Sequence, residues 1–567
     1  MENKYGLVRD LLIKAAAEYG YREALVWLEG DEVKSINYGT LLNKVKSLYH
    51  NLYIRGWKDK HIGILAPNSE KWVILYFTVL SGLGVAVPIG VTENAESVAY
   101  MCGNGDISAA FCQNTFLPMI PEGIDALDIA ELDSFCNDAV ADFDDAAPEA
   151  DKMCKILYTS GTTGQKRGVM LTMNNIMSIA SSYYGKYNGS RTLCSLPFSH
   201  GYEAVCHLLS ALNAGSTICI GRSALRFVQD IKTFNPESVY LVPAQADALL
   251  RSFSRVLDST PSLKTVVCGG ATIRQGLITD FAEKGIKLLG GYGLSECSPL
   301  VSLNEDATPD SVGKEAPYCE VRIANPDEHG TGEIQVKGDN VMLGYYRNEK
   351  DTAATFTDDG WLKTGDVGRK DENGNLYISG RIKNLIVLPN GENIIPEELE
   401  QQLAAALPGG SEPIVSDEHG TLTATLYTDE EQAEGLSQLL KKAVEQFNKT
   451  VPPFMRILAQ TVSTETPDRT SLGKIKRSNW GRPAEDSPER EAEKAAEAAE
   501  KAERAAKVAR EKAQKAFERA VEDAEKAAEN ARKAAEKAAD LADKADMSAK
   551  RAAEMAAELK ALLADDE

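Results

Sequence analysis

Two patterns of apolar and polar residues alternate along positions 1–477. Amphipathic segments with helical spacing, such as residues 38–56, are followed by short runs of β-branched and other apolar residues. Such runs, which stop at glycine or proline, are typical of fully buried strands. The alternation therefore predicts an α/β fold, with mostly parallel sheets covered by helices. Four examples are HIGILAP (61–67), GVAVPI (84–89), SVYLVP (238–243) and TVVCGG (265–270).

The pattern changes from residue 332 onward, where short alternating segments are separated by tight turns. This texture predicts a small antiparallel subdomain. The segments that carry it are GEIQVKG (332–338), NLYISG (375–380) and LIVLPNGEN (385–393). A compact α+β region is expected to follow. We therefore expect a large N-terminal domain over 1–381 and a small, mobile C-terminal domain over 384–478.

The last part of the chain has a different composition. Residues 489–567 lack glycine, proline and cysteine, and consist mostly of alanine with charged residues. Their alanines recur every three to four positions, which places a narrow alanine stripe on one face of a helix. The pattern predicts a helix or helical hairpin over 487–567. Its regularity suggests an appended or engineered element without chemistry of its own, whose expected use is self-association.

The composition narrows the class of protein. A chain of 567 residues that is 43% hydrophobic and 26% charged predicts a globular protein with two or three domains. The formal net charge of −22 disfavours binding to nucleic acid or to an anionic membrane, since both are polyanions. Glycine and proline interrupt the apolar stretch 72–89, so a buried helix followed by a buried strand is expected there instead of a membrane span.

The ten cysteines form no CxxC pair or other metal-ligand spacing. This scatter is typical of buried free thiols in a reducing cytoplasm, which is the expected location. The N-terminus mixes charged and apolar residues and is not predicted to be a signal peptide.

The strongest chemical signal is YTSGTTGQKRGV, at positions 158–169. It follows an apolar run that predicts a strand. Its glycines let the backbone turn its N–H groups toward an anion, and its hydroxyl and basic side chains add further donors. The segment is therefore predicted to hold phosphate, although it does not match the Walker A pattern. Its side-chain donors are Thr159, Ser160, Thr162, Thr163, Lys166 and Arg167.

This segment resembles the phosphate-binding motif of the adenylate-forming superfamily, which includes acyl-CoA synthetases, peptide-synthetase adenylation domains and luciferases. Further segments resemble the family's other motifs in the same order, and the resemblance as a whole spans essentially residues 1–478. The segments are SLPFSHGYE (195–203), CGGATI (268–273), GYGLSECSP (291–299), WLKTGDVG (361–368), SGRIKNLIVLPNGENIIPEELE (379–400) and TSLGKIKR (470–477). The sequences of two of them, 195–203 and 379–400, are most similar to the long-chain fatty acyl-CoA synthetase branch.

The resemblance implies a two-step reaction. The carboxylate of a small-molecule acid, expected to be a fatty acid, attacks the α-phosphate of ATP and yields acyl-AMP and pyrophosphate. A thiol then displaces AMP. The implied cofactors are ATP, Mg²⁺ and coenzyme A, with the phosphopantetheine of an acyl carrier protein as the alternative acceptor.

The resemblance also implies roles for individual residues. The β- and γ-phosphates would lie against Thr159, Ser160, Gly161, Thr162, Thr163, Gly164, Lys166 and Arg167. Tyr292 would stack on adenine, and Gly270 and Ala271 would line the same pocket. Gly293 and Ser295 would also contact the nucleotide. Asp366, expected at a strand end, would accept hydrogen bonds from the ribose hydroxyls, and Arg381 would approach ribose or phosphate.

Four further roles concern catalysis. Glu296 would hold Mg²⁺, a hard cation that prefers carboxylate and phosphate oxygens. Lys474 would reach the α-phosphate and the substrate carboxylate during adenylation. Lys383 matches the family's hinge, about which the small domain rotates between the two steps. His200 matches the residue beside the acyl pocket.

The sequence departs from the family pattern at several positions. Lys166-Arg167 stand where Pro-Lys is usual, Ser295 replaces threonine, and Asn384 replaces a common aspartate. Ser199 follows Phe198 where the amino-acid-activating branch places an aspartate for the substrate ammonium group, which argues against an α-amino acid. Amino-acid adenylation remains one alternative. A catalytically inactive scaffold that uses the helical tail is another.

Overall fold

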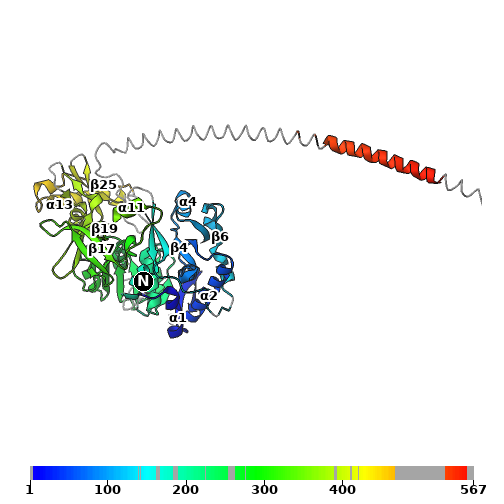
Figure 1. The fold of residues 1–567 in the computed structure, drawn as a ribbon. Coiled ribbons are helices and arrows are strands. Elements are labelled where there is room, and N and C mark those ends of the chain that lie inside the picture. Colours follow the sequence, from blue (N-terminus) through cyan, green and yellow to red (C-terminus); the bar gives the residue numbers. More distant parts are fainter. Residues whose placement is uncertain are drawn as a thin grey trace, which may run out of the picture. The chain divides into compact units, whose positions relative to one another are not determined.

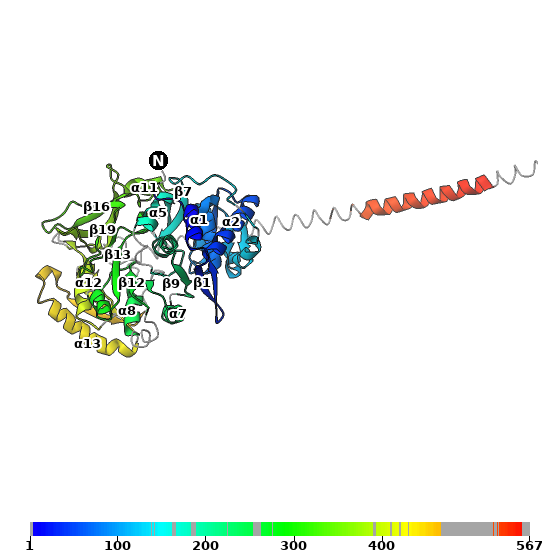
Figure 2. The same ribbon diagram turned by 90° about the horizontal axis from the view of Figure 1, so that it is seen from below.

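The computed structural model divides the chain into two compact units, Met1–Gly481 and Arg482–Glu567, which are described separately. It describes residues 4–137, 139–140, 142–160, 166–182, 189–223, 225–252, 262–274, 276–388, 393–408, 411–418, 421–428, 430–465, 526, 530 and 532–557. Within the first unit, two large sheets with helices against them make up the N-terminal part (Figures 1 and 2).

The first large sheet has seven strands in the order β18-β8-β7-β4-β3-β5-β6. Strands β3 to β7 pair in parallel, whereas β8 and β18 add antiparallel at one edge. The bounds are β3 Lys60–Leu65, β4 Gly84–Pro88, β5 Ile107–Cys112, β6 Asp125–Asp128, β7 Met153–Ser160, β8 Lys166–Thr172 and β18 Gly344–Tyr345. The two ends of the predicted phosphate segment, 158–169, lie in strands β7 and β8.

The second large sheet has nine strands in the order β15-β14-β13-β12-β11-β9-β10-β1-β2. Its six middle strands are parallel, and its edges are antiparallel. The bounds are β1 Glu23–Glu29, β2 Glu32–Asn37, β9 Arg191–Cys194, β10 Thr217–Ile220, β11 Ser238–Leu241, β12 Thr265–Cys268, β13 Lys287–Tyr292, β14 Ser302–Leu303 and β15 Lys314–Glu315. The α/β prediction is confirmed.

The helices form where amphipathic spacing and caps coincide. In α2, Tyr38–Ile54, Leu41, Val45, Leu48 and Leu52 are buried on one face, and the Asn37 side chain caps its start by accepting from the Thr40 N–H. The other longer helices are α1 Val8–Tyr19, α3 Glu70–Thr78, α4 Ala95–Asn104, α5 Met173–Ser182, α7 Phe227–Phe234, α8 Pro243–Arg251, α12 Pro396–Ala405 and α13 Glu430–Phe447.

The shorter helical turns are η1 Val79–Leu83, η2 Asn114–Met119, η3 Ile129–Phe135, η4 Tyr202–Leu209, α6 Ser210–Asn213, α10 Leu277–Ala282, η6 Ser295–Cys297, α11 Glu349–Thr355, η7 Ile382–Asn384 and η8 Pro453–Met455. The stretch 72–89 is the predicted buried helix followed by a buried strand, α3 and η1 leading into β4. Among the described residues, no helix has the length and apolar character needed to cross a bilayer.

A four-stranded antiparallel sheet follows, in the order β16-β17-β19-β20. It contains the predicted segments 332–338 and 375–380 but begins before residue 332, and the described part of 385–393 belongs to a separate two-stranded sheet. Its bounds are β16 Cys319–Ala324, β17 Gly332–Gly338, β19 Leu362–Lys370 and β20 Leu376–Arg381. Beyond it lie β21 Ile386–Val387, β22 Asn393–Ile394, β23 Pro413–Glu418, β24 Thr421–Tyr427 and β25 Ala459–Ser463. With α12 and α13, drawn in yellow tones in Figure 2, these strands enclose a hydrophobic cluster of their own, which includes Leu399, Leu422 and Leu440. The mobility of this region remains a prediction.

In the second unit, residues 532–557 form a helix, drawn in red in Figure 1, and every residue of this helix is exposed. The helix falls within the span where one was predicted. Self-association through it remains a prediction.

A lysine side chain is buried in the core at β7 of the first sheet. Lys155 of β7 is fully buried, and its Nζ donates to the Tyr76 hydroxyl at 3.0 Å. No carboxylate forms an ion pair with it within the described ranges. Burial lowers the pKa of Lys155 to about 8, because a charged ammonium group loses its hydration there.

Replacing Lys155 with methionine is expected to raise the free energy of unfolding at pH 7 by about 2 kcal/mol. The lowered pKa corresponds to a penalty of about 3 kcal/mol, from which losing the Tyr76 hydrogen bond subtracts about 1 kcal/mol. The folded pKa lies below the unfolded one, so the penalty is complete below pH 8 and disappears as the pH rises toward about 10.4. Denaturant unfolding should therefore show the advantage of the variant shrinking above pH 8. The exposed Lys152→Met serves as the control, and an equal gain there would contradict this explanation.

Candidate active site

Asp366 is the best-defined of the predicted site residues. It is 4% exposed, and its two carboxylate oxygens have different partners. Oδ2 accepts a hydrogen bond from the Tyr292 hydroxyl at 2.7 Å, and Oδ1 lies 2.6 Å from Arg381 Nε. Burial, and then the Asp366 charge, raise the pKa of the Tyr292 phenol well above its ordinary value, so it remains a donor at neutral pH. The three predicted residues thus form one polar group.

Strand register explains this meeting. Asp366 and Arg381 are direct partners in the antiparallel pair β19-β20, which places both side chains on the same face. Tyr292 arrives from another sheet, as the last residue of β13. One expectation was wrong: Asp366 lies within β19, not at a strand end, next to a register shift at Val367–Gly368.

The predicted adenine-pocket residues follow neighbouring parallel strands. Gly270 and Ala271 lie two and three residues beyond the end of β12, and Tyr292 ends the adjacent β13, where Cys268 of β12 pairs with Gly290. The carboxyl ends of parallel strands share one edge, which is where α/β proteins bind ligands. At Gly293 an added Cβ would lie 1.7 Å from the Pro299 carbonyl oxygen, so only glycine fits the close approach of these two backbone segments.

Glu296, the predicted metal ligand, lies in η6 together with Ser295. Its Oε1 accepts a hydrogen bond from the Tyr345 hydroxyl at 2.8 Å, and its backbone oxygen accepts from the Met342 N–H at 2.9 Å. The Arg167 guanidinium lies 4.4 Å from the centre of the Tyr345 ring. Tyr345 therefore connects the candidate metal carboxylate to the basic end of the phosphate segment.

The two basic residues of the phosphate segment lie at the start of β8. Lys166 Nζ donates to Glu93 Oε1 at 2.7 Å, and Arg167 Nη1 lies 3.6 Å from Asp351. These four side chains are one fifth to one third exposed. Ion pairs of this kind contribute little, so the partners can be exchanged for a phosphate at small cost.

Two buried donors at the entrance to the phosphate segment have no partner within the described residues. They are Thr159 Oγ1 and Arg167 Nε. Thr159 of β7 faces Arg167 of β8 in the antiparallel register, so both side chains lie on one face. Buried polar groups are nearly always hydrogen-bonded, and an unpaired pair of donors fits an anion.

His200 lies half-buried in the SLPFSHGYE segment. Its pKa is lowered to about 4, chiefly by burial, with Lys155 and Lys166 acting in the same direction and Glu93 opposing them. The imidazole is therefore neutral at pH 7. It can donate one hydrogen bond and accept another there, but it supplies no positive charge.

Several predicted residues are not brought into this group. Gly161, Thr162, Thr163, Gly164 and Lys474 lie outside the described residues, and of Ser160 only the backbone, in β7, is described. Lys383 lies in η7, exposed, between the last strand of the four-stranded sheet and β21.

Sequence reasoning missed Glu93, Tyr345 and Thr364. Thr364 Oγ1 accepts from the Asp366 N–H at 3.0 Å and so holds the strand beside the carboxylate. The Thr-Gly-Asp spacing in the WLKTGDVG segment was a signal for Thr364. Glu93 and Tyr345 gave no local signal, because their partners are 73 and 49 positions away.

A family described as AMP-binding enzyme matches residues 12–346 of the chain. The peroxisomal OPC-8:0-CoA ligase 1 of Arabidopsis thaliana is 26% identical over 502 residues, which cover 81% of this chain and 90% of the relative. The long-chain-fatty-acid–CoA ligase FadD13 of Mycobacterium tuberculosis is 26% identical over 447 residues, or 74% of this chain and 87% of the relative.

Among solved structures, the O-succinylbenzoate coenzyme A synthetase of Bacillus subtilis in complex with AMP superposes with a TM-score of 0.69 at 22% sequence identity. The match covers 83% of this chain and 99% of the other. At this identity the likeness concerns the fold.

Proposed function

The chain belongs to the AMP-binding enzyme family, and from this premise we propose that it activates a fatty acid with ATP and passes the acyl group to coenzyme A. Membership makes it an enzyme of the AMP-forming acid–thiol ligase type. The observation that best supports the nucleotide half of the proposal is the buried Asp366 carboxylate held by Tyr292 and Arg381.

In this proposal the ribose binds at Asp366. Each carboxylate oxygen has one partner in the structure, and a carboxylate offers about four acceptor positions. Two positions therefore remain for the two ribose hydroxyls. The Tyr292 ring, fixed by its hydroxyl, presents a flat apolar surface to adenine.

The phosphates bind where buried donors lack partners. Thr159 Oγ1 and Arg167 Nε donate to phosphate oxygens. Lys166 gives up its hydrogen bond to Glu93 and binds the phosphate instead. Glu296 fits Mg²⁺, because a carboxylate oriented by a tyrosine hydroxyl is a ligand that this cation prefers. When bound, Mg²⁺ neutralises negative charge on the phosphates. Fixed donors and cations then stabilise the charge that develops as the acid carboxylate displaces pyrophosphate.

The substrate class is tested by a pyrophosphate-release screen over fatty, aromatic and α-amino acids, with and without coenzyme A. Medium- or long-chain fatty acids are expected to give the highest kcat/KM. An amino acid substrate needs a carboxylate for its ammonium group. Ser199, which stands where that carboxylate is expected, supplies none. An amino acid with the highest kcat/KM would overturn the proposal, and a carrier protein outcompeting coenzyme A would change the acceptor.

Truncating the chain after Arg482 is expected to leave activity within about tenfold of the full-length value, which corresponds to about 1.4 kcal/mol in barrier. All the motifs precede this point, and the compact first unit ends at Gly481. Steady-state pyrophosphate release by both forms checks this. Sedimentation of the two forms checks the proposed self-association, since only the full-length chain should form an oligomer. A larger loss of activity would show that the tail takes part in the reaction.

The rival from another class is an inactive scaffold that works through its tail. Calorimetry of ATP binding distinguishes the enzyme from the scaffold. The enzyme must bind ATP, whereas a scaffold needs no nucleotide. The intact Asp366–Tyr292–Arg381 group favours the enzyme.

A further inference from the structure

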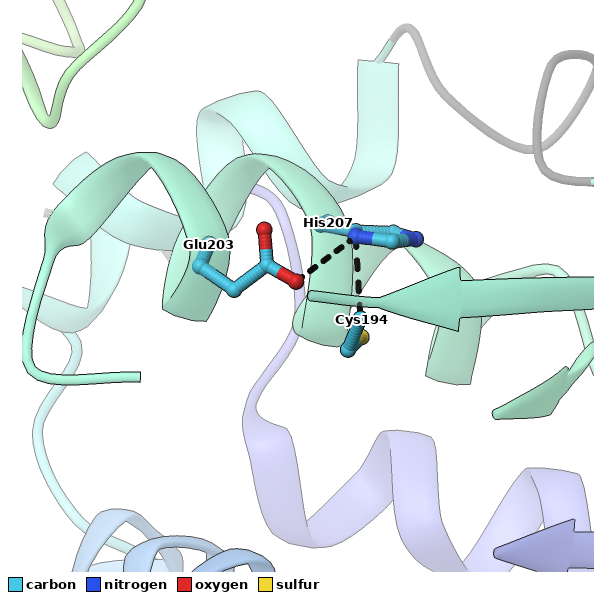
Figure 3. Close-up of side chains that lie close together, drawn as sticks. All are labelled: Cys194, Glu203 and His207. Carbon is cyan, nitrogen blue, oxygen red and sulfur yellow. Dashed lines mark hydrogen bonds and ion pairs between the residues drawn. The ribbon is translucent and has the colours of Figure 1, made fainter. Parts of the chain in front are cut away.

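Three buried side chains at and just beyond the two ends of the SLPFSHGYE segment lie close together (Figure 3). Cys194 is the last residue of β9, and Glu203 and His207 lie one turn apart in the π-helix η4. His207 Nδ1 lies 3.1 Å from Glu203 Oε1 and 3.5 Å from Cys194 Sγ. All three side chains have no solvent exposure.

The hydrogen bonds of this group are incomplete. One ring nitrogen, His207 Nδ1, faces both a carboxylate oxygen and a sulfur, although a single N–H can serve only one of them well. Glu203 Oε2 is buried and has no partner within the described chain. Nor does any lysine or arginine of the described ranges form an ion pair with this carboxylate, whose one ion pair is with His207. A buried, half-satisfied carboxylate is costly.

The other ring nitrogen of His207 and one face of its ring have defined contacts. His207 Nε2 lies 2.6 Å from Thr192 Oγ1, which in turn accepts from the Ser238 hydroxyl at 2.8 Å. The Tyr240 ring stacks on the imidazole, with ring centres 3.7 Å apart. This arrangement fixes the ring orientation with Nε2 toward Thr192, which leaves Nδ1 directed at the carboxylate and the sulfur. Metal-binding histidines are commonly held through their second nitrogen in this way.

We propose that Cys194, Glu203 and His207 supply three ligands to a buried Zn²⁺ ion. Thiolate, carboxylate and imidazole are the ligands that zinc takes in proteins. With bonds of about 2.0–2.3 Å, the edges of a zinc tetrahedron measure about 3.3–3.6 Å. The two separations at Nδ1, 3.1 and 3.5 Å, are close to this, and the three ligand atoms lie within 4.8 Å of one another. A thiolate and a carboxylate balance the charge of Zn²⁺, so the buried centre is neutral. The ion also gives the carboxylate the cation it lacks.

The position of the centre gives it a role. Cys194 directly precedes, and Glu203 ends, the segment that carries Phe198 and His200. A metal bound to both joins the two ends of this loop and attaches η4 to β9. We infer that the ion holds the segment in shape. That the segment lines the acyl site rests on the proposed function, whereas metal binding itself does not.

Metal content tests the proposal directly. The full-length protein, produced with zinc supplied and purified without metal-affinity resin, is expected to contain about one zinc per chain by elemental mass spectrometry. Cys194→Ala and His207→Gln should reduce this to background. Cys102→Ala, which removes a buried thiol in a different hydrophobic cluster, and Glu296→Gln, at the candidate Mg²⁺ site, should retain the zinc.

Cobalt substitution provides a second measurement that needs no variant. Protein produced with cobalt should show the thiolate-to-cobalt charge-transfer absorption that only a cysteine ligand gives. Folded wild-type protein that contains neither metal would overturn the proposal and leave a Glu203–His207 ion pair as the explanation. Zinc retained at full stoichiometry in Cys194→Ala would also overturn it. Neither measurement uses a substrate, so failure of the proposed function leaves these outcomes unchanged.

Discussion

Replacing Lys474 with alanine is expected to slow acyl-adenylate formation by on the order of 100-fold or more. Thioester formation from pre-made acyl-AMP should continue at nearly the normal rate. The expectation comes from the TSLGKIKR segment, since Lys474 lies outside the described residues. If the small domain rotates about Lys383, Lys474 meets the α-phosphate only during adenylation, where negative charge accumulates, and is removed before the thiol attacks.

The two half-reactions are measured separately, by pyrophosphate release and by thioester formation from synthetic acyl-AMP. Lys476→Ala removes the same charge two positions along the same segment, so it controls for a general loss of positive charge and should have little effect. Equal losses in both steps would mean that Lys474 is structural or that the domain does not alternate. Full activity in both would remove Lys474 from the site.

Replacing Asp366 with asparagine is expected to lower kcat/KM for ATP by on the order of 100-fold, which corresponds to about 2.7 kcal/mol. The variant keeps the shape of the side chain but loses the charge that both ribose hydroxyls would donate to. Hydrogen bonds to charged groups contribute about 1.5–3 kcal/mol each. The change also leaves the Arg381 guanidinium without its carboxylate partner.

Deoxynucleotides separate binding from damage to the fold. Wild-type enzyme should use 2′-deoxy-ATP and 3′-deoxy-ATP poorly. The variant should barely distinguish them from ATP, because removing the carboxylate and removing the hydroxyl abolish the same hydrogen bond. Breaking a buried ion pair also destabilises a protein, so the Tm of the variant is measured alongside. Asp371→Asn, in the exposed turn after β19, is the matched control. A variant with normal ATP kinetics would remove Asp366 from the nucleotide site.

Features that depend only on neighbouring residues in the sequence could be predicted. A strand buried on both faces must be apolar throughout, so the runs at 61–67 and 265–270 identified β3 and β12 without any tertiary information. The glycine- and hydroxyl-rich segment at 158–169 likewise shows its chemistry in its own composition. The sequence by itself thus determined the α/β class, the presence of an antiparallel sheet late in the chain, and the family, and it supplied the residues proposed for the nucleotide site.

Only the tertiary structure decided which side chains meet. The pairing of Asp366 with Arg381 depends on the register of β19 and β20, and the contact with Tyr292 joins residues 74 positions apart through two different sheets. The contacts of Lys166 with Glu93 and of Glu296 with Tyr345 depend in the same way on how distant strands and loops pack. The convergence of Cys194, Glu203 and His207 has the same origin. The four-residue spacing of Glu203 and His207 is local, but the approach of Cys194 depends on how the end of β9 packs against η4.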